Sequence, residues 1–455
     1  MKLEDRELTI GTEDYSLLTD LYQLTMAACY AGEGLAQCPA SFELFVRHLP
    51  KGFSYLIAMG LAQAIEYLEK FHFNESQLNA LQATGIFEKA PEQFWSLLAE
   101  GRFTGDVWAV PEGTAIFANE PLLRVEAPLW QAQVVETYLL NAINYQTLIA
   151  TRAARMRDAA GPDAKLLEFG TRRAFSPQAS LWAARAALAA GLDATSNVLA
   201  ALKLGCQPSG TMAHSLVMAI AAVEGNEQEA FSAFYRYFPN SVLLIDTYDT
   251  VAAAASLAQR EKAGEIQVAG VRIDSGDFAT LSQKVRSLLP NATIFASGDL
   301  DEYKIAQLKH DGACINGYGL GTYLVTGLPV NGVYKLVEID GIATMKQSSS
   351  KVTYPGRKQI YRQIDNGKFM KDRLALISES PLEHEYPLLQ LVIQQGQQVK
   401  APERLEDIQK RTATSVASLA TTTRQLHDAT PLPVEISEGL QQLTEITKQR
   451  QENKR

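Results

Sequence analysis

The middle third of the chain alternates short apolar runs with segments of helical spacing, and this alternation restricts the fold more than any other feature of the sequence. The apolar runs are LLEF at 166–169, a short stretch around 210–212, VLLI at 242–245, VAGVRI at 268–273, TIFA at 293–296 and ACIN at 313–316. Strands that alternate with helices predict a parallel sheet with helices outside it. About six such units in succession favour a barrel of the (β/α)8 type over an open sheet.

Both ends of the chain show a different pattern. Short apolar runs separated by turn residues predict antiparallel strands within 105–128. Further along, the pairs Asp340-Gly341 and Asn366-Gly367 predict hairpin turns. The two ends are therefore expected to form one sheet-containing domain beside the alternating segment.

Helical spacing outside the alternating segment completes the predicted organisation. It predicts helices at 15–31, 59–72, 91–100 and 129–160, and the polar tail from 435 to 455 predicts a surface helix or a frayed end. We therefore predict an α/β barrel domain over 131–339. A discontinuous α/β domain is predicted from 1–130 together with 340–455.

Composition excludes several classes of protein. The chain has 455 residues, 46% of them hydrophobic, and a formal net charge of −9, which is typical of a globular protein and argues against a nucleic-acid binder. The sequence contains no run of about eighteen apolar residues and therefore predicts no membrane span, and the N-terminus lacks the apolar core of a signal peptide. Four scattered cysteines without C-x-x-C spacing favour a reducing compartment. We expect a cytoplasmic enzyme.

Polar and glycine-rich residues follow each predicted strand. They are GTRR at 170–173, AHS at 213–215, DTYD at 246–249, DSGD at 274–277, SGD at 297–299 and GYGLGT at 317–322. In an α/β barrel the loops at the carboxyl ends of the strands build the active site. The sequence therefore predicts an active site at this end of the barrel.

Two of these loops are suited to binding phosphate or diphosphate groups. Gly319, Gly321 and Thr322 lie late in the barrel, where glycines let backbone N–H groups approach an anion, although a plain tight turn has the same pattern. Asp274 and Asp277 suit a Mg²⁺-bound diphosphate or ribose hydroxyls. The alternative for Asp277 is an N-cap of the following helix.

Basic side chains and one histidine are further candidates. The adjacent Arg172 and Arg173 require anionic partners if they are buried, and Arg binds a carboxylate or phosphate bidentately. His214 at a strand end is either a nucleophile or proton carrier, or a buried histidine with a structural role. The basic segment 346–358 is a solvated face by default, and an anion-binding loop is the alternative.

These motifs in this order resemble nicotinate phosphoribosyltransferases over nearly the whole chain. The matching stretches are LLTDLYQLTM, FELFVRHLPKGFSYLIAMGL, LEFGTRRAFSPQAS, GLDATSNVLAALKLGCQPSGTMAHS, LLIDTYDT, GVRIDSGD, GYGLGT and KVTYPGRKQIYR. The resemblance implies an irregular α/β barrel of the type II phosphoribosyltransferase kind beside an α/β domain built from both chain ends. It also implies a homodimer whose active sites lie at the subunit interface.

The resemblance further implies a reaction in NAD salvage. Nicotinate and phosphoribosyl pyrophosphate form nicotinate mononucleotide and pyrophosphate, with Mg²⁺, and ATP hydrolysis is coupled through a phosphohistidine at His214. By matching position, Phe169 and a neighbouring subunit's Tyr22 would stack on the pyridine ring, and the residues near nicotinate would be Thr171, Arg172 and Ser196. Arg272 and Asp274 would lie near the ribose and phosphates, and the 5′-phosphate would be held by Gly298, Gly319, Gly321 and Thr322. Lys351 and Lys358 would contact phosphates across the dimer, and Asp274 with Asp277 would hold Mg²⁺ or Mg²⁺-diphosphate.

The choice between acid and amide substrates follows from charge. A nicotinamide-using relative is expected to place a carboxylate near the amide, whereas residues 194–197 read Ala-Thr-Ser-Asn here, with Asp193 just before them. The absence of an acid within this stretch favours nicotinate. The alternatives are a nicotinamide or quinolinate phosphoribosyltransferase, or a non-catalytic nucleotide-binding barrel.

Overall fold

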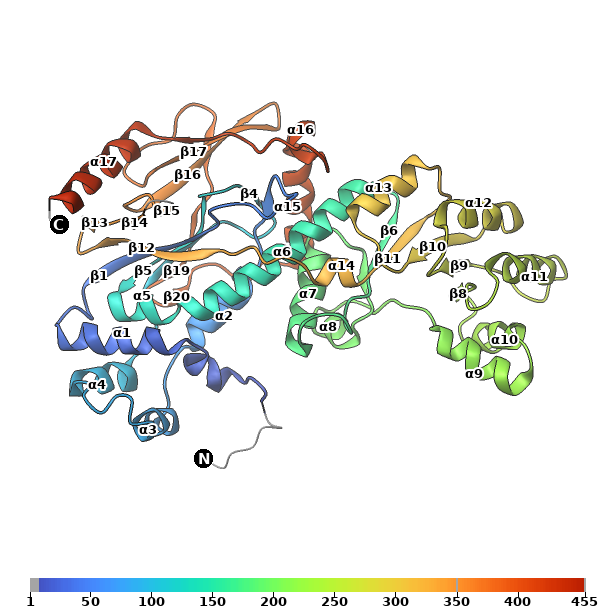
Figure 1. The fold of residues 1–455 in the computed structure, drawn as a ribbon, viewed down its shortest axis with the longest axis horizontal. Helices are drawn as coiled ribbons and strands as arrows, with labels where there is room; N and C mark the ends of the chain where they lie inside the picture. Colours follow the sequence, from blue (N-terminus) through green and yellow to red (C-terminus); the bar gives the residue numbers. More distant parts are fainter. Residues whose placement is uncertain (1–7, 349–350, 454–455) are drawn as a thin grey trace. The chain divides into compact units, whose positions relative to one another are not determined.

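The computed structural model describes residues 8–348 and 351–453, and it describes side chains outside 347–352. The chain forms two compact units (Figure 1): the chain up to Leu148 together with the chain from Pro329 onwards, and Ile149–Leu328. The sequence places the borders at 130/131 and 339/340 instead. Helix α6 (Glu136–Ala160) runs across the first observed border. Because a continuous helix contains no turn residue, no local sequence signal marks this border.

The unit 149–328 is built around one parallel sheet of six strands (Figure 1). In the order β7-β6-β11-β10-β9-β8 they are Ala194–Thr195, Lys165–Glu168, Gly317–Leu320, Thr293–Ser297, Gly270–Ile273 and Val242–Leu244. This confirms the predicted α/β class with a parallel sheet. Within the described residues the edge strands β7 and β8 do not pair with each other, so the sheet is open and the predicted closure into a (β/α)8-type barrel is not found.

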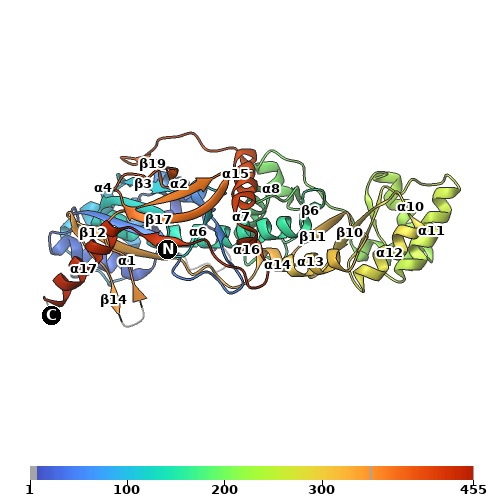
Figure 2. The same cartoon turned by 90° about the horizontal axis from the view of Figure 1, so that it is seen from above.

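Helices connect these strands, and polar side chains start most of them. They are α7 (Pro177–Ala189), α8 (Val198–Lys203), α9 (His214–Glu224), α10 (Glu227–Tyr237), α11 (Thr250–Lys262), α12 (Phe278–Leu288), α13 (Glu302–His310) and α14 (Thr322–Val325). Helices α11 and α12 pack against each other beside the strands (Figure 2). The N-cap side chains accept hydrogen bonds from the first free backbone N–H groups, as seen at Ser176, Asn197, Asn226, Asp249, Asp277 and Asp301.

Two predicted strands are wrong. Residues 210–212 form a loop, and the strand in this region is the two-residue β7. The last strand is the glycine-containing GYGL at 317–320 rather than ACIN at 313–316. Its glycines are required because Phe rings of the adjacent segments lie against them. A Cβ at Gly319 would lie 2.6 Å from the ring of Phe169, and one at Gly317 would collide with Phe295.

The other unit contains sheets that join both ends of the chain. Its seven-stranded sheet has the order β13-β12-β1-β5-β3-β19-β20, with bounds Ile342–Ala343, Val333–Ile339, Pro39–Phe45, Pro121–Pro128, Asp106–Ala109, Gln390–Gln394 and Gln397–Gln398. Strand β1 pairs antiparallel with both β5 and β12, so N-terminal and C-terminal segments share this sheet, as predicted. Positive φ angles at Asp340 (48°) and Gly341 (71°) confirm the hairpin turn between β12 and β13.

A four-stranded sheet and two short pairs complete the strands of this unit. The sheet has the order β18-β16-β17-β21, with bounds Glu385–Pro387, Lys358–Asp365, Lys368–Leu376 and Val434–Ile436. The pairs are β2 (Leu56–Ile57) with β4 (Ala115–Ile116), and β14 (Gln347–Ser348) with β15 (Lys351–Val352). The hairpin turn between β16 and β17 has positive φ at Asn366 (47°) and Gly367 (73°), as predicted.

The helices of this unit agree in part with the prediction. They are η1 (Thr12–Leu17, a 3-10 helix), α1 (Leu21–Gly32), α2 (Leu61–Lys70), α3 (Glu75–Ala83), α4 (Glu92–Glu100), α5 (Leu129–Val134), α15 (Leu405–Ser418), α16 (Thr421–Arg424) and α17 (Glu438–Glu452). The predicted helix 129–160 is two helices, α5 and α6, on either side of Val135. In the described part of the chain, no helix is long and apolar enough to cross a membrane.

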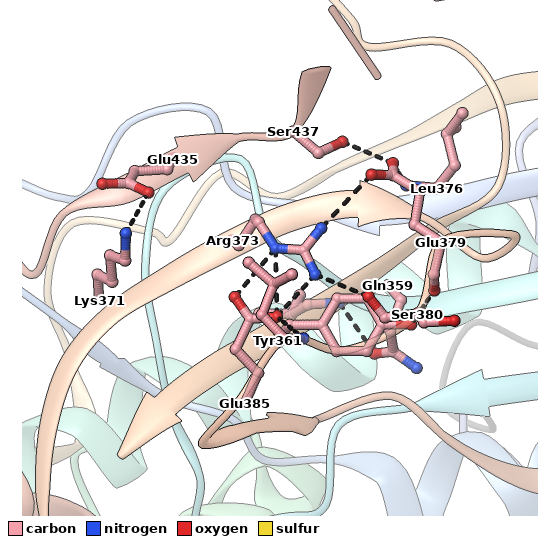
Figure 3. A network of polar contacts seen from close by, with 12 residues as sticks. Gln359, Tyr361, Lys371, Arg373, Leu376, Glu379, Ser380, Glu385, Glu435 and Ser437 are labelled. Atoms are coloured by element: carbon pink, nitrogen blue, oxygen red, sulfur yellow. Dashed lines mark hydrogen bonds and ion pairs between the residues drawn. The ribbon is translucent and has the colours of Figure 1, made fainter. Parts of the chain in front are cut away.

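A polar network fixes the C-terminal segment to the four-stranded sheet (Figure 3). Arg373 of β17 binds Glu385 at 2.6 Å and Glu379 at 3.4 Å, and its guanidinium lies 4.9 Å from the ring centroid of Tyr361. Glu379 also accepts a 2.6 Å hydrogen bond from Ser437, the N-cap of α17. One arginine therefore links β17, β18 and the start of the last helix.

Candidate active site

One face of the parallel sheet borders a cavity of about 460 Å³. Its lining residues are Lys165, Leu167, Phe169, Asp193, Ala194, Ser209, Gly210, Thr211, Asn240, Ser241, Val242, Arg272, Phe295 and Gly319. Phe169 directly follows β6, and Arg272 and Gly319 are the second-to-last residues of β9 and β11, so part of the lining lies near the carboxyl ends of strands, where α/β folds of this kind place their active sites. The cavity is therefore the candidate active site.

An aromatic ring and a glycine form one wall of the cavity. Phe169 directly follows β6, and its ring occupies the space that a side chain at residue 319 would need. The guanidinium of Arg272 lies 5.9 Å from the centroid of the same ring. A planar aromatic ligand can stack on such a ring, and a cation at this distance favours an anionic group beside it.

Arg272 lines this cavity and has one buried donor without a partner in the described part of the chain. Its Nη1 donates to Thr211 Oγ1 at 2.5 Å, and its Nη2 donates to the carbonyl of Met212 at 2.8 Å. Its buried Nε finds no hydrogen-bond partner among the described residues. Burial lowers the pKa of Arg272, and the nearby Arg172 lowers it further, against the opposing effect of neighbouring carboxylates. A buried cation with an unused donor is suited to an anion.

His214 is held by a buried carboxylate. It is the first residue of α9, and its Nε2 lies 3.1 Å from Oδ1 of Asp246, whose side chain is 2% exposed. The other oxygen of Asp246 accepts hydrogen bonds from the backbone N–H of Asp274 at 2.9 Å and from Ser275 Oγ at 2.7 Å. Asp246 therefore joins three segments, and it leaves the Nδ1 side of the imidazole without this contact.

The two acids of the DSGD motif have different surroundings. Asp274 accepts a hydrogen bond from Ser297 Oγ. Asp277 is exposed and caps α12, with hydrogen bonds from Thr280 Oγ1 at 2.6 Å and Thr280 N at 3.3 Å that lower the pKa of its carboxyl. The capping alternative therefore describes Asp277 in this structure. Among the described residues no group of three His, Cys, Asp or Glu side chains is placed to hold a metal ion.

The glycines predicted to bind phosphate occupy different kinds of backbone. Gly298 has φ +92°, and a Cβ there would collide with the carbonyl of Asp274, so this turn requires glycine. Gly319 belongs to strand β11 rather than to a loop. Gly321 precedes the four-residue helix α14, of which Thr322 is the first residue.

Three predicted nicotinate contacts lie in the segments that flank Phe169. Thr171 and Arg172 are exposed in the turn before α7. Ser196 follows β7, is half-buried, and its N–H donates to the carbonyl of Glu168 at 2.9 Å. The effect of Arg172 on the pKa of Arg272 places its charge close to the cavity.

The remaining predicted residues lie in the other unit. Tyr22 is 48% exposed in α1, and partial burial together with Glu136 raises the pKa of its hydroxyl. The side chain of Lys351 is outside the described residues. Lys358 Nζ lies 2.8 Å from Glu43 Oε2, and it donates to two backbone carbonyls at 2.8 Å each. Lys358 is therefore buried and held by Glu43 and two carbonyls, and its contact with a phosphate across the dimer stays a prediction.

Sequence reasoning assigned no individual role to three residues that hold the candidate site residues in place. Asp246 shares the D-x-x-D spacing of Asp274 and Asp277, which was a usable signal. Thr211 binds Arg272 from a loop that precedes it by 61 residues, and no local pattern marks such a contact. Glu168 stands inside an apolar strand, where a buried acid is itself a signal.

Comparisons with known proteins identify the family. Models of the nicotinate phosphoribosyltransferase (NAPRTase) N-terminal domain, family and C-terminal domain match residues 17–144, 164–312 and 384–444. The nicotinate phosphoribosyltransferase of Bacillus subtilis (strain 168) is 44% identical over 386 residues, which cover 81% of this chain and 77% of that protein. The human nicotinate phosphoribosyltransferase is 32% identical over 514 residues, covering 94% and 95%. The crystal structure of human nicotinic acid phosphoribosyltransferase matches with a TM-score of 0.81 at 29% identity, covering 94% of this chain and 99% of that one. The chain belongs to the nicotinate phosphoribosyltransferase family.

Proposed function

We propose that this chain transfers the phosphoribosyl group of phosphoribosyl pyrophosphate to nicotinate. The observation that carries the proposal is the pairing of the Phe169 ring with the unused donor of Arg272 in one cavity. The pyridine nitrogen of nicotinate uses its lone pair to form a bond to C1 of the ribose. The C1–O bond to the diphosphate breaks, and its electron pair leaves with the diphosphate. The products are nicotinate mononucleotide and pyrophosphate.

The chain's contribution to this step is to position and stabilise charge. Positive charge develops on the sugar while negative charge develops on the leaving diphosphate. Arg272 is fixed by Thr211 and Met212, so its charge needs no rearrangement during the reaction. Asp274 is fixed by Ser297 beside it, where its carboxylate suits ribose hydroxyls. The family position of Gly298, Gly319, Gly321 and Thr322 supports a 5′-phosphate site there.

Charge supports nicotinate as the pyridine substrate. Arg172 supplies a cation for the pyridine carboxylate at the rim. Asp193, the carboxylate closest in sequence to Ser196, accepts hydrogen bonds from Arg157 at 2.5 Å and from Leu166 N at 2.7 Å. Both bonds end on Oδ2, and Lys165 lies 3.7 Å from Oδ1, so two cations offset the charge of Asp193 and weaken the repulsion that an acid substrate would meet.

ATP is the proposed co-substrate, with His214 as the phosphoryl acceptor. Because Nε2 is held by Asp246, the lone pair on Nδ1 is the one available to attack the γ-phosphorus. A bond forms between Nδ1 and phosphorus, the bridging P–O bond breaks, and ADP leaves. Asp246 stabilises the positive imidazole that results. Water later cleaves the phosphohistidine.

Further parts of the proposal concern magnesium, assembly and location. The described residues do not offer a three-ligand cage, and Mg²⁺ in such reactions is commonly held by substrate phosphates with one or two carboxylates. Magnesium therefore enters as part of the diphosphate substrate beside Asp274. We also propose a homodimer in which Tyr22 of one subunit completes the pyridine site of the other, and a cytoplasmic role in NAD salvage, and the family resemblance supports both.

The test is a panel of pyridines with ATP present and absent. Nicotinate should be converted in preference to nicotinamide and quinolinate, and ATP should increase turnover. His214→Asn should remove the ATP stimulation while leaving basal transfer measurable. Preference for nicotinamide or quinolinate would replace the proposed substrate, and full ATP stimulation in His214→Asn would exclude the phosphohistidine. Absence of transfer to any pyridine, with nucleotide binding retained, would favour a non-catalytic role.

A further inference from the structure

Glu168 is a buried acid next to the proposed stacking residue, and the reaction as described does not use it. It is the last residue of β6, and the whole residue is 1% exposed. We infer that Glu168 is a positioning residue that fixes the two segments flanking Phe169 and thereby sets the affinity for the pyridine carboxylate. This inference rests on the proposed function.

The carboxylate of Glu168 joins these two segments. One oxygen accepts a hydrogen bond from the N–H of Gly170, at the start of the turn that carries Arg172. The other accepts a hydrogen bond from Thr195 Oγ1, at the end of β7. Gly170 directly follows Phe169 in the chain, whereas Thr195 lies opposite Glu168 on the neighbouring parallel strand β7.

We call Glu168, Gly170 and Thr195 the clamp, and backbone contacts extend this clamp to Ser196. The carbonyl of Glu168 accepts the N–H of Ser196 at 2.9 Å, and Thr195 Oγ1 accepts the N–H of Asn197 at 2.9 Å. Asn197 in turn caps α8 and donates to Ser180 of α7 at 3.1 Å. The segment that carries Ser196 is thus held from Glu168 and from two helices.

The glycine after Phe169 fits this arrangement closely. A Cβ at Gly170 would collide with Val325 and would lie 2.9 Å from Oε1 of Glu168. The turn therefore packs directly on the carboxylate, and its N–H points at Glu168 rather than into the cavity. The donors left for a pyridine carboxylate are those carried further out, by Arg172 and Ser196, and their placement depends on the clamp.

Burial without a cation makes Glu168 unusual among the buried acids of this unit. Burial raises the pKa of its carboxyl, and the hydrogen bonds from Thr195 and Gly170 oppose this change. Glu302, by comparison, is buried against Arg155 at 2.9 Å, on helix α13 rather than beside Phe169. Glu302 therefore provides a matched control for the loss of a buried carboxylate.

The experiment compares Glu168→Ala, Glu168→Gln and Glu302→Ala in the full chain by steady-state kinetics with nicotinate and phosphoribosyl pyrophosphate. Glu168→Ala should raise the KM for nicotinate at least tenfold and change the KM for phosphoribosyl pyrophosphate less than threefold. Glu168→Gln, which keeps an acceptor for Gly170, should return the nicotinate KM to within threefold of the wild type. Glu302→Ala should lower the melting temperature without raising the KM for nicotinate relative to the KM for phosphoribosyl pyrophosphate.

Several results would overturn the inference. Equal changes in both KM values, or an unchanged nicotinate KM in Glu168→Ala, would reduce Glu168 to a general structural role. If Glu168→Ala does not fold, Thr195→Val serves instead, because it removes one donor to Glu168 and should raise the nicotinate KM at least threefold; an unchanged value contradicts the clamp. A wild-type chain without transfer to nicotinate would overturn the proposed function itself, which is a distinguishable outcome.

Discussion

Adding one methyl group at Gly319 tests the geometry of the proposed stacking site. A Cβ at this position would lie 2.6 Å from Cδ2 and Cε2 of Phe169 and 3.1 Å from Cβ of Ser297. The first distance is shorter than any carbon–carbon contact that a packed protein tolerates. Because the backbone of β11 is held between β6 and β10, the ring of Phe169 has to move into the cavity.

The structure gives the size of the effect of Gly319→Ala. Overpacking of this kind costs about 1–3 kcal/mol of folding free energy. If unit 149–328 unfolds as one body, this corresponds to a fall in melting temperature of about 2–12 °C. Loss of a favourable aromatic stack costs about 0.5–1.5 kcal/mol, so the KM for nicotinate should rise roughly two- to thirteenfold.

Gly210→Ala is the matched control, because Gly210 lines the same cavity and an added Cβ meets nothing closer than Ser196 Cβ at 4.0 Å. Thermal unfolding and steady-state kinetics of both variants should separate them, with Gly210→Ala close to the wild type. A Gly319→Ala variant that keeps the wild-type KM for nicotinate would refute the placement of the pyridine ring on Phe169. Equal effects of the two substitutions would show that the cavity, rather than the ring, is responsible.

Three further predictions concern charges away from that ring. Lys358→Met should destabilise folding by about 3–5 kcal/mol in urea unfolding, because it leaves Glu43 buried and unpaired, and adding Glu43→Leu should recover most of the loss. Burial and the nearby Asp372 raise the pKa of Glu120, so the contribution of Glu120 to stability should fall as the pH rises above about 4.3. The unfolding free energy of Glu120→Gln, measured relative to that of the wild type, should therefore increase with pH. Asp277→Ala should lower the melting temperature and Asp277→Asn should not, because Asn also caps a helix, and neither should alter the magnesium dependence of turnover.

Four of the six parallel strands, β6, β8, β9 and β10, could be predicted because each contains a short apolar run. The runs at 242–245, 268–273 and 293–296 match β8, β9 and β10 within a few residues. The last strand escaped prediction because glycines have a low strand propensity. Its glycines are explained by rings on neighbouring segments, and this three-dimensional fact is not visible locally.

In the candidate site as well, local motifs could be recognised in the sequence, whereas contacts between residues far apart in the sequence could not. A strand-end motif singled out His214, and the family resemblance singled out Phe169 and Arg272, which the structure brings into one cavity. The ion pair of Lys358 could not be predicted, because its partner Glu43 lies 315 residues away in the sequence. A basic run in the sequence therefore gave no indication that one of its members is buried.

In the loops after strands β8 and β9, one short motif contains both a residue of the proposed site and a helix N-cap. In each D-x-x-D motif the first acid comes within two residues of the strand end, and the second comes three residues later. The first acids, Asp246 and Asp274, bind His214 and Ser297 across the loops. The second acids, Asp249 and Asp277, cap α11 and α12. For a single acid, the choice between a helix cap and a site residue is therefore decided by its distance from the strand end. Because the caps lie where the helices begin, a helix cap and a residue of the proposed site stand within the same four residues.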